Sequence, residues 1–131
     1  MRANEIMISD YLSYKGQVIK VASITKKKVG YHIKDNEYRM HYARLCECKS
    51  VFITSEILEK NFESESNIFG LQTYKLNENF NLENRGDRFC LVRKCRYYYS
   101  STFWICDLVY LHQIQHALRL CGIEKEIKLK D

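Results

Sequence analysis

Proline is absent from the 131 residues of the chain, and glycine occurs only five times. Linkers between domains usually draw on these two residues, so no segment of the sequence stands out as a boundary. Apolar residues make up 46% and charged residues 28%, a balance that supplies a core and argues against a disordered chain. We therefore expect one compact domain over residues 1–131.

Long apolar runs are missing as well. No segment has the length and composition of a membrane-spanning helix, and residues 1–5 start no apolar run of the kind found in secretory signals. We expect a cytoplasmic protein with no membrane partner. In a reducing compartment the six cysteines are free thiols, namely Cys46, Cys48, Cys90, Cys95, Cys106 and Cys121.

The charge of the chain is only mildly unbalanced. Lys and Arg number 21 against 16 Asp and Glu, which leaves a net charge of +5. Such an excess favours small anionic partners such as phosphates and nucleotides, and it lacks the dense basic stripe of a duplex-binding protein. The run Lys26–Lys28 is interpreted as a solvated turn.

Residues 1–53 contain five short strand-like runs separated by turn signals. Lys15-Gly16 joins the runs 11–14 and 18–24, and Asp35-Asn36 joins 29–33 to 38–42. The fifth run covers residues 48–53. Five short strands with tight turns are typical of a small, partly closed barrel, so we predict an SH3-like barrel in residues 1–53.

The hydrophobic period changes after residue 53. Thr54 is a helix N-cap candidate for a short middle helix, with Glu56 in its first turn. Strand patterns then follow at 72–76, at 88–93 and in a hairpin over 97–106. An amphipathic helix begins at Leu111 and ends before Gly122. The predicted fold is α+β, with SH3-like strands in 1–53 and a helix-sheet-helix part in 54–131.

Catalytic motifs are absent from the sequence: there is no glycine-rich elbow, phosphate loop or carboxylate pair. We predict a binding protein that is not an enzyme and needs no cofactor. A histidine-based phosphodiesterase, assembled from distant residues, is the enzymatic alternative. His112 and His116 have the spacing of paired metal ligands on a helix, and Cys106 or Cys121 could supply a further ligand, but the sequence does not fix the distance of either cysteine, so no metal site is predicted.

The strongest functional pattern is the interleaving of basic and aromatic residues before and within the last hairpin. Guanidinium groups hold phosphate, and aromatic faces stack on bases. Polar residues of the last helix add further donors. The predicted ligand-binding residues are Arg93, Arg96, Tyr97, Tyr99, Trp104, His112, Gln115 and Arg119. The alternative interpretation is a hairpin with one aromatic face in the core, solvated arginines and a solvated helix face.

Three segments resemble small proteins frequent in Bacteroidetes phages and prophages. They are residues 2–21, residues 53–62 and residues 109–127, the last of which contains Leu111-His112-Gln113-Ile114-Gln115. That run is similar to the Val-His-Gln-Leu-Gln signature near the C-terminus of these proteins. The tyrosine-rich hairpin lies outside the three segments, and the prolines that usually precede the middle helix are missing here.

The resemblance implies a phage product that acts in the cytoplasm of its bacterial host. Small non-enzymatic phage proteins often neutralise host defence by sequestering a nucleotide immune signal, such as a cyclic dinucleotide or an ADP-ribose derivative. We therefore predict an anti-defence sponge for such a ligand, and a homo-oligomer if its pocket lies between subunits. The alternatives are a module that inhibits a host enzyme through the SH3-like half, and a weak nucleic-acid binder whose affinity falls steeply with salt.

Overall fold

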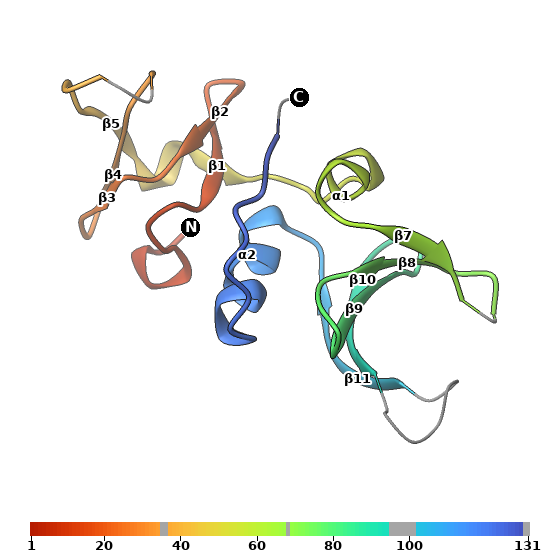
Figure 1. Cartoon of the computed structure of the whole chain (residues 1–131). Coiled ribbons are helices and arrows are strands. Elements are labelled where there is room, and N and C mark those ends of the chain that lie inside the picture. The colour runs from red at the N-terminus through yellow and green to blue at the C-terminus, as the bar shows by residue number, and fades with distance from the viewer. Residues whose placement is uncertain (35–36, 68, 95–101, 130–131) are drawn as a thin grey trace. The chain divides into compact units, whose positions relative to one another are not determined.

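The computed structural model of the chain describes residues 1–34, 37–67, 69–94 and 102–129 (Figure 1). It has the predicted α+β composition, with small antiparallel sheets and two α-helices. The chain forms two compact units. Unit 1 consists of Met1–Phe52 and Tyr110–His116, and unit 2 of Ile53–Val109 and Ala117–Asp131.

Unit 1 contains two three-stranded antiparallel sheets, with the strand orders β2-β1-β6 and β3-β4-β5. Its strands do not join into one closed barrel within the described residues, so the predicted SH3-like barrel is not confirmed. Two short 3-10 helices, η1 and η2, accompany the sheets. The elements are η1 (Ala3–Glu5), β1 (Tyr11–Tyr14), β2 (Gln17–Lys20), β3 (Ser23–Ile24), β4 (Lys28–Tyr31), β5 (His41–Arg44), η2 (Leu45–Glu47) and β6 (Cys48–Ser50).

The first hairpin of unit 1 turns where the sequence predicts. Lys15 and Gly16 both have positive φ angles, 48° and 78°, which suit a two-residue turn between twisted strands. The predicted run 18–24 is divided, however, between two sheets. The Val21 amide donates to the Asp10 carbonyl at 2.9 Å and extends the pairing of β1 with β2, whereas the Ala22 amide donates to the Gly30 carbonyl at 2.7 Å. The chain thereby leaves the first sheet and joins the second.

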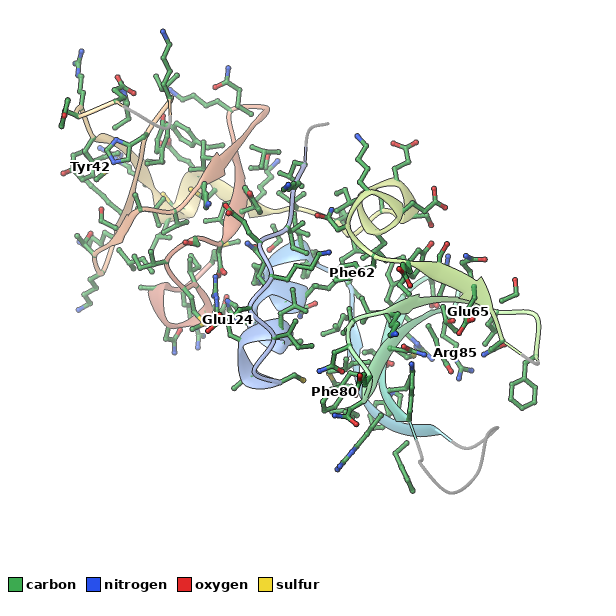
Figure 2. All side chains as sticks on the ribbon, in the orientation of Figure 1. Tyr42, Phe62, Glu65, Phe80, Arg85 and Glu124 are labelled. Carbon is green, nitrogen blue, oxygen red and sulfur yellow. The ribbon has the colours of Figure 1, made fainter. Side chains whose placement is uncertain are left out.

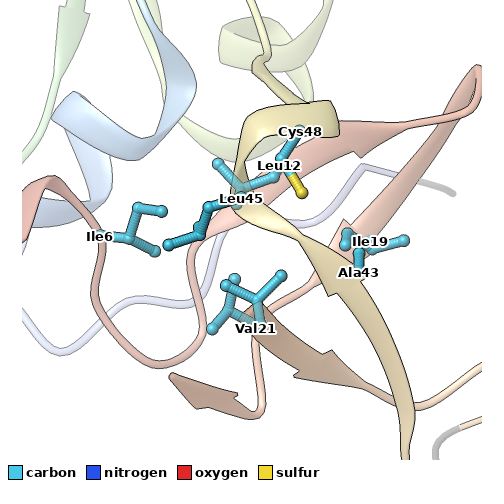
Figure 3. Packing of buried hydrophobic residues seen from close by; sticks show 8 residues of the cluster. Ile6, Leu12, Ile19, Val21, Ala43, Leu45 and Cys48 are labelled. Atoms are coloured by element: carbon cyan, nitrogen blue, oxygen red, sulfur yellow. The ribbon is translucent and has the colours of Figure 1, made fainter. Parts of the chain in front are cut away.

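The core of unit 1 draws on both of its sheets (Figure 3). Leu12 of β1 and Val29 of β4 are completely buried. Burying one such side chain contributes about 1.5–3 kcal/mol, so this cluster is the main stabilising feature of the unit. Its buried members are Ile6, Leu12, Ile19, Val21, Val29, Ala43, Leu45 and Cys48.

Unit 2 is built on one five-stranded antiparallel sheet with the strand order β11-β10-β9-β8-β7. The Thr54 side chain caps the helix before the sheet, because its hydroxyl accepts a hydrogen bond from the Ile57 amide at 3.2 Å. The predicted N-cap is therefore confirmed. The elements are α1 (Ser55–Asn61), β7 (Ser64–Ser66), β8 (Gln72–Lys75), β9 (Phe80–Asn84), β10 (Phe89–Lys94) and β11 (Thr102–Leu108).

The strand register of this sheet separates a core face from a polar face. Tyr74, Leu82 and Leu91 are cross-strand neighbours and are almost completely buried, so they mark the core face. Glu65 and Arg85 lie within the curve of the sheet in Figure 2, and Phe80 lies on the outer side. The inner, polar face of the sheet is thus distinct from the face that carries the core.

A buried asparagine fixes the C-terminal segment of unit 2. The Asn61 side-chain nitrogen donates to the carbonyls of Ile57 and Lys128 at 2.7 and 2.8 Å, and its oxygen accepts from the Lys128 amide at 2.7 Å. All three bonds use one side chain at the end of α1. They explain how a segment without regular structure keeps Ile127 buried.

The last helix, α2 (Leu111–Leu120), begins in the part of the chain assigned to unit 1 and ends in the part assigned to unit 2. Leu111, Ile114 and Leu118 are buried, as the predicted periodicity requires. Gly122 has a φ of 72°, and the Ile123 amide closes the helix end on the Leu118 carbonyl at 2.8 Å. Neither helix of the described chain is both long and apolar enough to cross a membrane.

Candidate functional site

The predicted residues of the last hairpin are only partly described, and the two that can be compared diverge. Arg93 of β10 is the register partner of Phe103, whereas Trp104 of β11 is the partner of Val92. Neighbouring positions of a strand project to opposite faces, so Arg93 and Trp104 lie on opposite faces of the sheet. The predicted ligand residues Arg96, Tyr97 and Tyr99 lie outside the described residues.

The predicted helix residues His112 and Gln115 are buried in unit 1, so the expectation of an exposed polar face at these positions is wrong. The Gln115 side-chain nitrogen donates to the Ser9 carbonyl at 2.8 Å, and its oxygen accepts from the Tyr11 amide at 3.0 Å. The side-chain amide of Gln115 is therefore bonded to the backbone on either side of the start of β1. Arg119, by contrast, belongs to the part of the helix assigned to unit 2.

His112 belongs to a small polar cluster at the start of α2. Its ring stacks on Tyr110, with centroids 5.9 Å apart, and meets His116 edge-on. Burial lowers the pKa of His112, and its Nδ1 atom has no hydrogen-bond partner. His116 Nε2 lies 2.6 Å from a carboxylate oxygen of the fully buried Asp10. The cluster joins the helix to the chain before β1, and in the described residues no three metal-ligating groups come together.

A group of basic side chains lies at a different place, on the second sheet of unit 1. Lys26 and Lys27 form the turn between β3 and β4, closed by the Thr25 amide on the Lys28 carbonyl at 2.8 Å. Lys28 and Arg44 are register partners on β4 and β5. The Leu45 amide donates to the Lys27 carbonyl at 2.9 Å and holds η2 against this turn.

These elements surround an open cavity of about 580 Å³, which we call the basic pocket. It is lined by Met1, Lys26, Lys27, Lys28, Arg44, Leu45 and Cys46. Four of these side chains are cationic, and none is acidic. The side chains of the lysines and of Arg44 are exposed, so each can turn toward a ligand. Like charges gathered in this way repel one another, and an anion in the pocket removes that repulsion.

The charge of the whole chain is concentrated in the same unit. Unit 1 contains ten Lys or Arg and five Asp or Glu, whereas unit 2 contains eleven of each. The net charge of +5 is therefore the net charge of unit 1 alone. This segregation raises the local concentration of anions around the basic pocket.

A second cavity in unit 1 provides a natural comparison. It has a volume of about 500 Å³ and is lined by Ser13, Lys15, Gly16, Glu47 and Lys49. Two lysines here face one glutamate, so the lining is less positive than that of the basic pocket. Of the two cavities, the basic pocket is the better site for a multiply charged anion.

Two carboxylates on the polar face of unit 2, Glu83 and Asp107, are paired with arginines. Glu83, which is buried, accepts a hydrogen bond from Arg85 at 2.8 Å, and this contact raises the pKa of the guanidinium. Asp107 accepts from the Trp104 indole at 3.0 Å and from the Cys90 thiol at 3.1 Å, and Arg88 lies 3.5 Å away. These bonds lower the pKa of Asp107.

The described cysteines are free thiols, and burial makes most of them poor nucleophiles. Burial is the main cause that raises the pKa values of Cys48, Cys90, Cys106 and Cys121. A raised pKa disfavours the thiolate that a nucleophile needs. Cys46 is exposed at the basic pocket, and Cys95 lies outside the described residues.

Sequence reasoning missed the basic pocket because it assigned Lys26–Lys28 to a solvated turn. The lysine run was the part of the pocket visible in the sequence. Arg44 is sixteen positions away from Lys28 in the chain, and only the pairing of β4 with β5 brings it to the pocket. Comparison of the chain with family models, with curated proteins and with solved structures finds no match. The basic pocket is therefore the feature of the chain on which a function can be proposed.

Proposed function

We propose that this protein binds a small phosphate-bearing molecule of the nucleotide class in the basic pocket of unit 1, without converting it. The observation that supports this most directly is the convergence of Lys26, Lys27, Lys28 and Arg44 on one cavity whose described lining contains no acidic side chain. Ammonium and guanidinium groups are the usual protein partners of phosphate oxygens. A ligand with more than one phosphate matches four cations better than a monoanion does.

The size of the pocket agrees with a small molecule. A volume of about 580 Å³ lies within the range of cavities that hold ligands of nucleotide size. Leu45 and Met1 add apolar surface beside the cations, against which a sugar or base can pack. Duplex nucleic acid is a poorer match, because its backbone needs a row of cations rather than one cluster.

The resemblance to phage proteins gives this binding activity its biological setting in our proposal. The protein would act in the cytoplasm of a bacterial host and hold a cyclic dinucleotide or an ADP-ribose derivative away from its receptor. Sequestration requires affinity and slow release, and it needs no catalytic group. The proposal rests on the two three-stranded sheets of unit 1 and not on an SH3-like closure of the barrel.

The proposal is tested by depletion and release. The full chain is mixed with a panel of cyclic dinucleotides, ADP-ribose, ADP and pyrophosphate, the protein is removed by filtration, and the free ligand is measured. The retained fraction is then heated. We expect one ligand class to be depleted and to return intact. A ligand that disappears and returns as a product would instead identify an enzyme, and no depletion across the panel would contradict the proposal.

The site is tested with charge-matched double variants. Lys27→Ala/Arg44→Ala removes two cations from the basic pocket, and Lys15→Ala/Lys49→Ala removes two cations from the second cavity of the same unit. We expect the first pair to weaken binding by about tenfold or more, because two charge-assisted contacts exceed 1.4 kcal/mol together. The second pair should change the affinity by less than about threefold, through net charge alone. Equal losses in both variants would place the site elsewhere.

A further inference from the structure

The five-stranded sheet of unit 2 has two edges of very different character. The edge strand β7 is three residues long, and its sequence Ser64-Glu65-Ser66 is entirely polar and exposed. The other edge strand, β11, is seven residues long and contains Phe103, Trp104 and Ile105. Short, charged edges prevent sheets from pairing with one another, whereas long apolar edges invite it. By these criteria β7 is protected and β11 is open.

The apolar side chains of β11 are exposed on both faces of the sheet. Phe103 is 60% exposed, Trp104 is 64% exposed and Ile105 is 43% exposed. The register between β10 and β11 shifts between Leu91 and Val92, so that Ile105 has no direct partner on β10. A β-bulge of this kind interrupts the alternation of the strand. Three consecutive apolar residues therefore remain in contact with water.

The outer side of β11 is also free to form main-chain hydrogen bonds. Among the described residues, β11 pairs with β10 alone. Its one charged side chain, Asp107, is held by Trp104, Cys90 and Arg88 and does not point a free charge along the edge. An edge with unpaired amides and carbonyls and apolar side chains is the kind of surface to which another β-strand adds.

We propose that the occupant of this edge is the β11 strand of a second copy of the chain, paired antiparallel to the first. The charges around the strand decide its orientation. Beside the Thr102 end of β11 lie Arg93 and Lys94 of β10, while the Leu108 end carries Asp107 with Arg88 at 3.5 Å, a pair without net charge. Antiparallel pairing places the basic end of each copy beside this neutral end of the other, whereas parallel pairing places the two basic ends together. The charges therefore favour antiparallel over parallel pairing of two copies.

The resulting dimer is symmetric and modest in size. A two-fold axis relates the two strands, so each residue contact occurs twice, and two five-stranded sheets become one ten-stranded sheet. One pair of strands with three apolar residues on each buries less surface than a permanent interface does. We therefore expect dissociation in the micromolar range. The interface is in unit 2, so it does not depend on ligand binding in the basic pocket.

The test is to measure the molar mass of the full chain in solution by analytical sedimentation, over concentrations from low to high micromolar. Trp104 is the only tryptophan, so its emission reports on the edge itself. We expect dimer formation and a blue shift of the emission over the same concentration range. Phe103→Lys should weaken the dimer by about tenfold or more, since a lysine on an edge strand opposes pairing.

Phe69→Lys is the matched control, because Phe69 is 76% exposed in the β7–β8 connection of the same unit. It should leave the dimer intact, and circular dichroism of both variants checks that they fold. Addition of a synthetic peptide with the sequence of residues 102–108 should dissociate the wild-type dimer. A chain that is monomeric at every concentration would leave the edge to a foreign strand and overturn the proposal. A dimer that Phe103→Lys does not weaken would overturn it as well.

Discussion

The two units of this chain treat charge in opposite ways. Unit 1 has an excess of five positive charges and gathers four cationic side chains around one cavity. Unit 2 is neutral, and on its polar face Glu83 and Asp107 each have an arginine partner. Paired charges are satisfied within the fold, whereas the cations of the basic pocket have no acidic neighbour in its lining. The comparison teaches that the proposed ligand site is the place where the fold leaves positive charge uncompensated.

The units also differ in their histidines, which titrate near neutral pH, and in their tryptophan content, which determines fluorescence. All four histidines, His32, His41, His112 and His116, belong to unit 1, and the single tryptophan belongs to unit 2. The fluorescence of Trp104 therefore reports on unit 2, while protonation of histidine reports on unit 1. This division allows the two units to be perturbed and observed separately.

The largest effect is expected from truncation of the unit 2 core. Leu82 is completely buried between Tyr74 and Leu91, its partners on the neighbouring strands. Leu82→Ala should lower the free energy of unfolding by about 2–5 kcal/mol, through lost apolar burial and the cavity left behind. The measurement is urea unfolding followed by Trp104 fluorescence. Leu120→Ala is the control, because Leu120 is 88% exposed and should change the midpoint little. An equal loss in both variants would show that burial does not govern the stability of this unit.

A somewhat smaller loss is expected in unit 1 at Gly30. A Cβ atom at this position would overlap the Ser23 hydroxyl and lie 2.8 Å from Met40 Sδ and 3.0 Å from Met40 Cγ. Gly30→Ala should cost about 1–3 kcal/mol, because the Ser23 and Met40 side chains must leave their present positions to admit the methyl group. Thermal unfolding followed by circular dichroism measures the loss.

The double variant Ser23→Ala/Gly30→Ala distinguishes the contribution of Ser23 to this loss from that of Met40. Removal of the Ser23 hydroxyl eliminates the nearest overlap, while the contact with Met40 remains. The double variant should therefore recover part of the stability. If it recovers none, the overlap with Ser23 is not the source of the loss.

Acid should destabilise unit 1 before unit 2. Burial lowers the pKa of His112 in the folded chain, so the unfolded state binds a proton more readily as the pH falls. Stability is then fully present above the usual histidine pKa of about 6.5 and declines below it, by at most about 1.4 kcal/mol per pH unit for one site. Three charged groups also act on the pKa of His112: Asp10 and Glu5 raise it and so oppose the effect of burial, whereas His116 lowers it further.

This prediction is checked by urea unfolding between pH 7.5 and about 5.5, a range in which few groups other than histidine titrate. In the His112→Phe variant, the free energy of unfolding measured by circular dichroism should depend less on pH than in the wild type. The Trp104 transition, which reports on unit 2, should move little over the same range. If the stability of the variant falls more steeply with acid than that of the wild type, His112 does not destabilise unit 1 at low pH and the prediction is wrong.

The smallest effect is expected from single charges in the basic pocket. Lys27→Gln should change stability by less than about 0.5 kcal/mol, since the side chain is exposed. At low salt the change should be stabilising, because one of four neighbouring cations is removed, and it should vanish at high salt. Lys75→Gln in the neutral unit is the control and should show no such gain. Melting temperatures at two ionic strengths measure both, and destabilisation by Lys27→Gln at low salt would contradict the repulsion.

Local features of the fold were predictable from the sequence because they depend on nearest neighbours. The turn at Lys15-Gly16, the cap at Thr54 and the helix end at Gly122 each follow from the properties of one or two residues. Five short strands were predicted in residues 1–53, whereas the structure has six, because the run 18–24 is divided between β2 and β3. The arrangement into two sheets was not predictable, because it depends on the Ala22 amide bonding to the carbonyl of Gly30 on β4.

The candidate site was less predictable, for a reason visible in two sets of residues. His112 and Gln115 have the polarity of a solvated helix face, but they are buried because Tyr110 and the backbone at Ser9 and Tyr11 provide partners. The basic pocket forms because β4 and β5 pair with Lys28 opposite Arg44. Polarity along a helix and charge along a chain do not specify long-range pairing, so both required the structure. The ligand role of Arg96, Tyr97 and Tyr99 stays a prediction.

The exposure of Cys46 has a practical consequence for following the ligand. Its side chain lies at the basic pocket and is exposed, whereas Cys48, two residues later, is buried in the core of unit 1. Of the described cysteines, Cys46 is therefore the one that a thiol-directed dye reaches first. The native chain thus carries its own attachment point for an environment-sensitive fluorophore beside the cavity. Binding of the proposed ligand can then be followed as a change in the emission of the fluorophore, without any substitution in the protein.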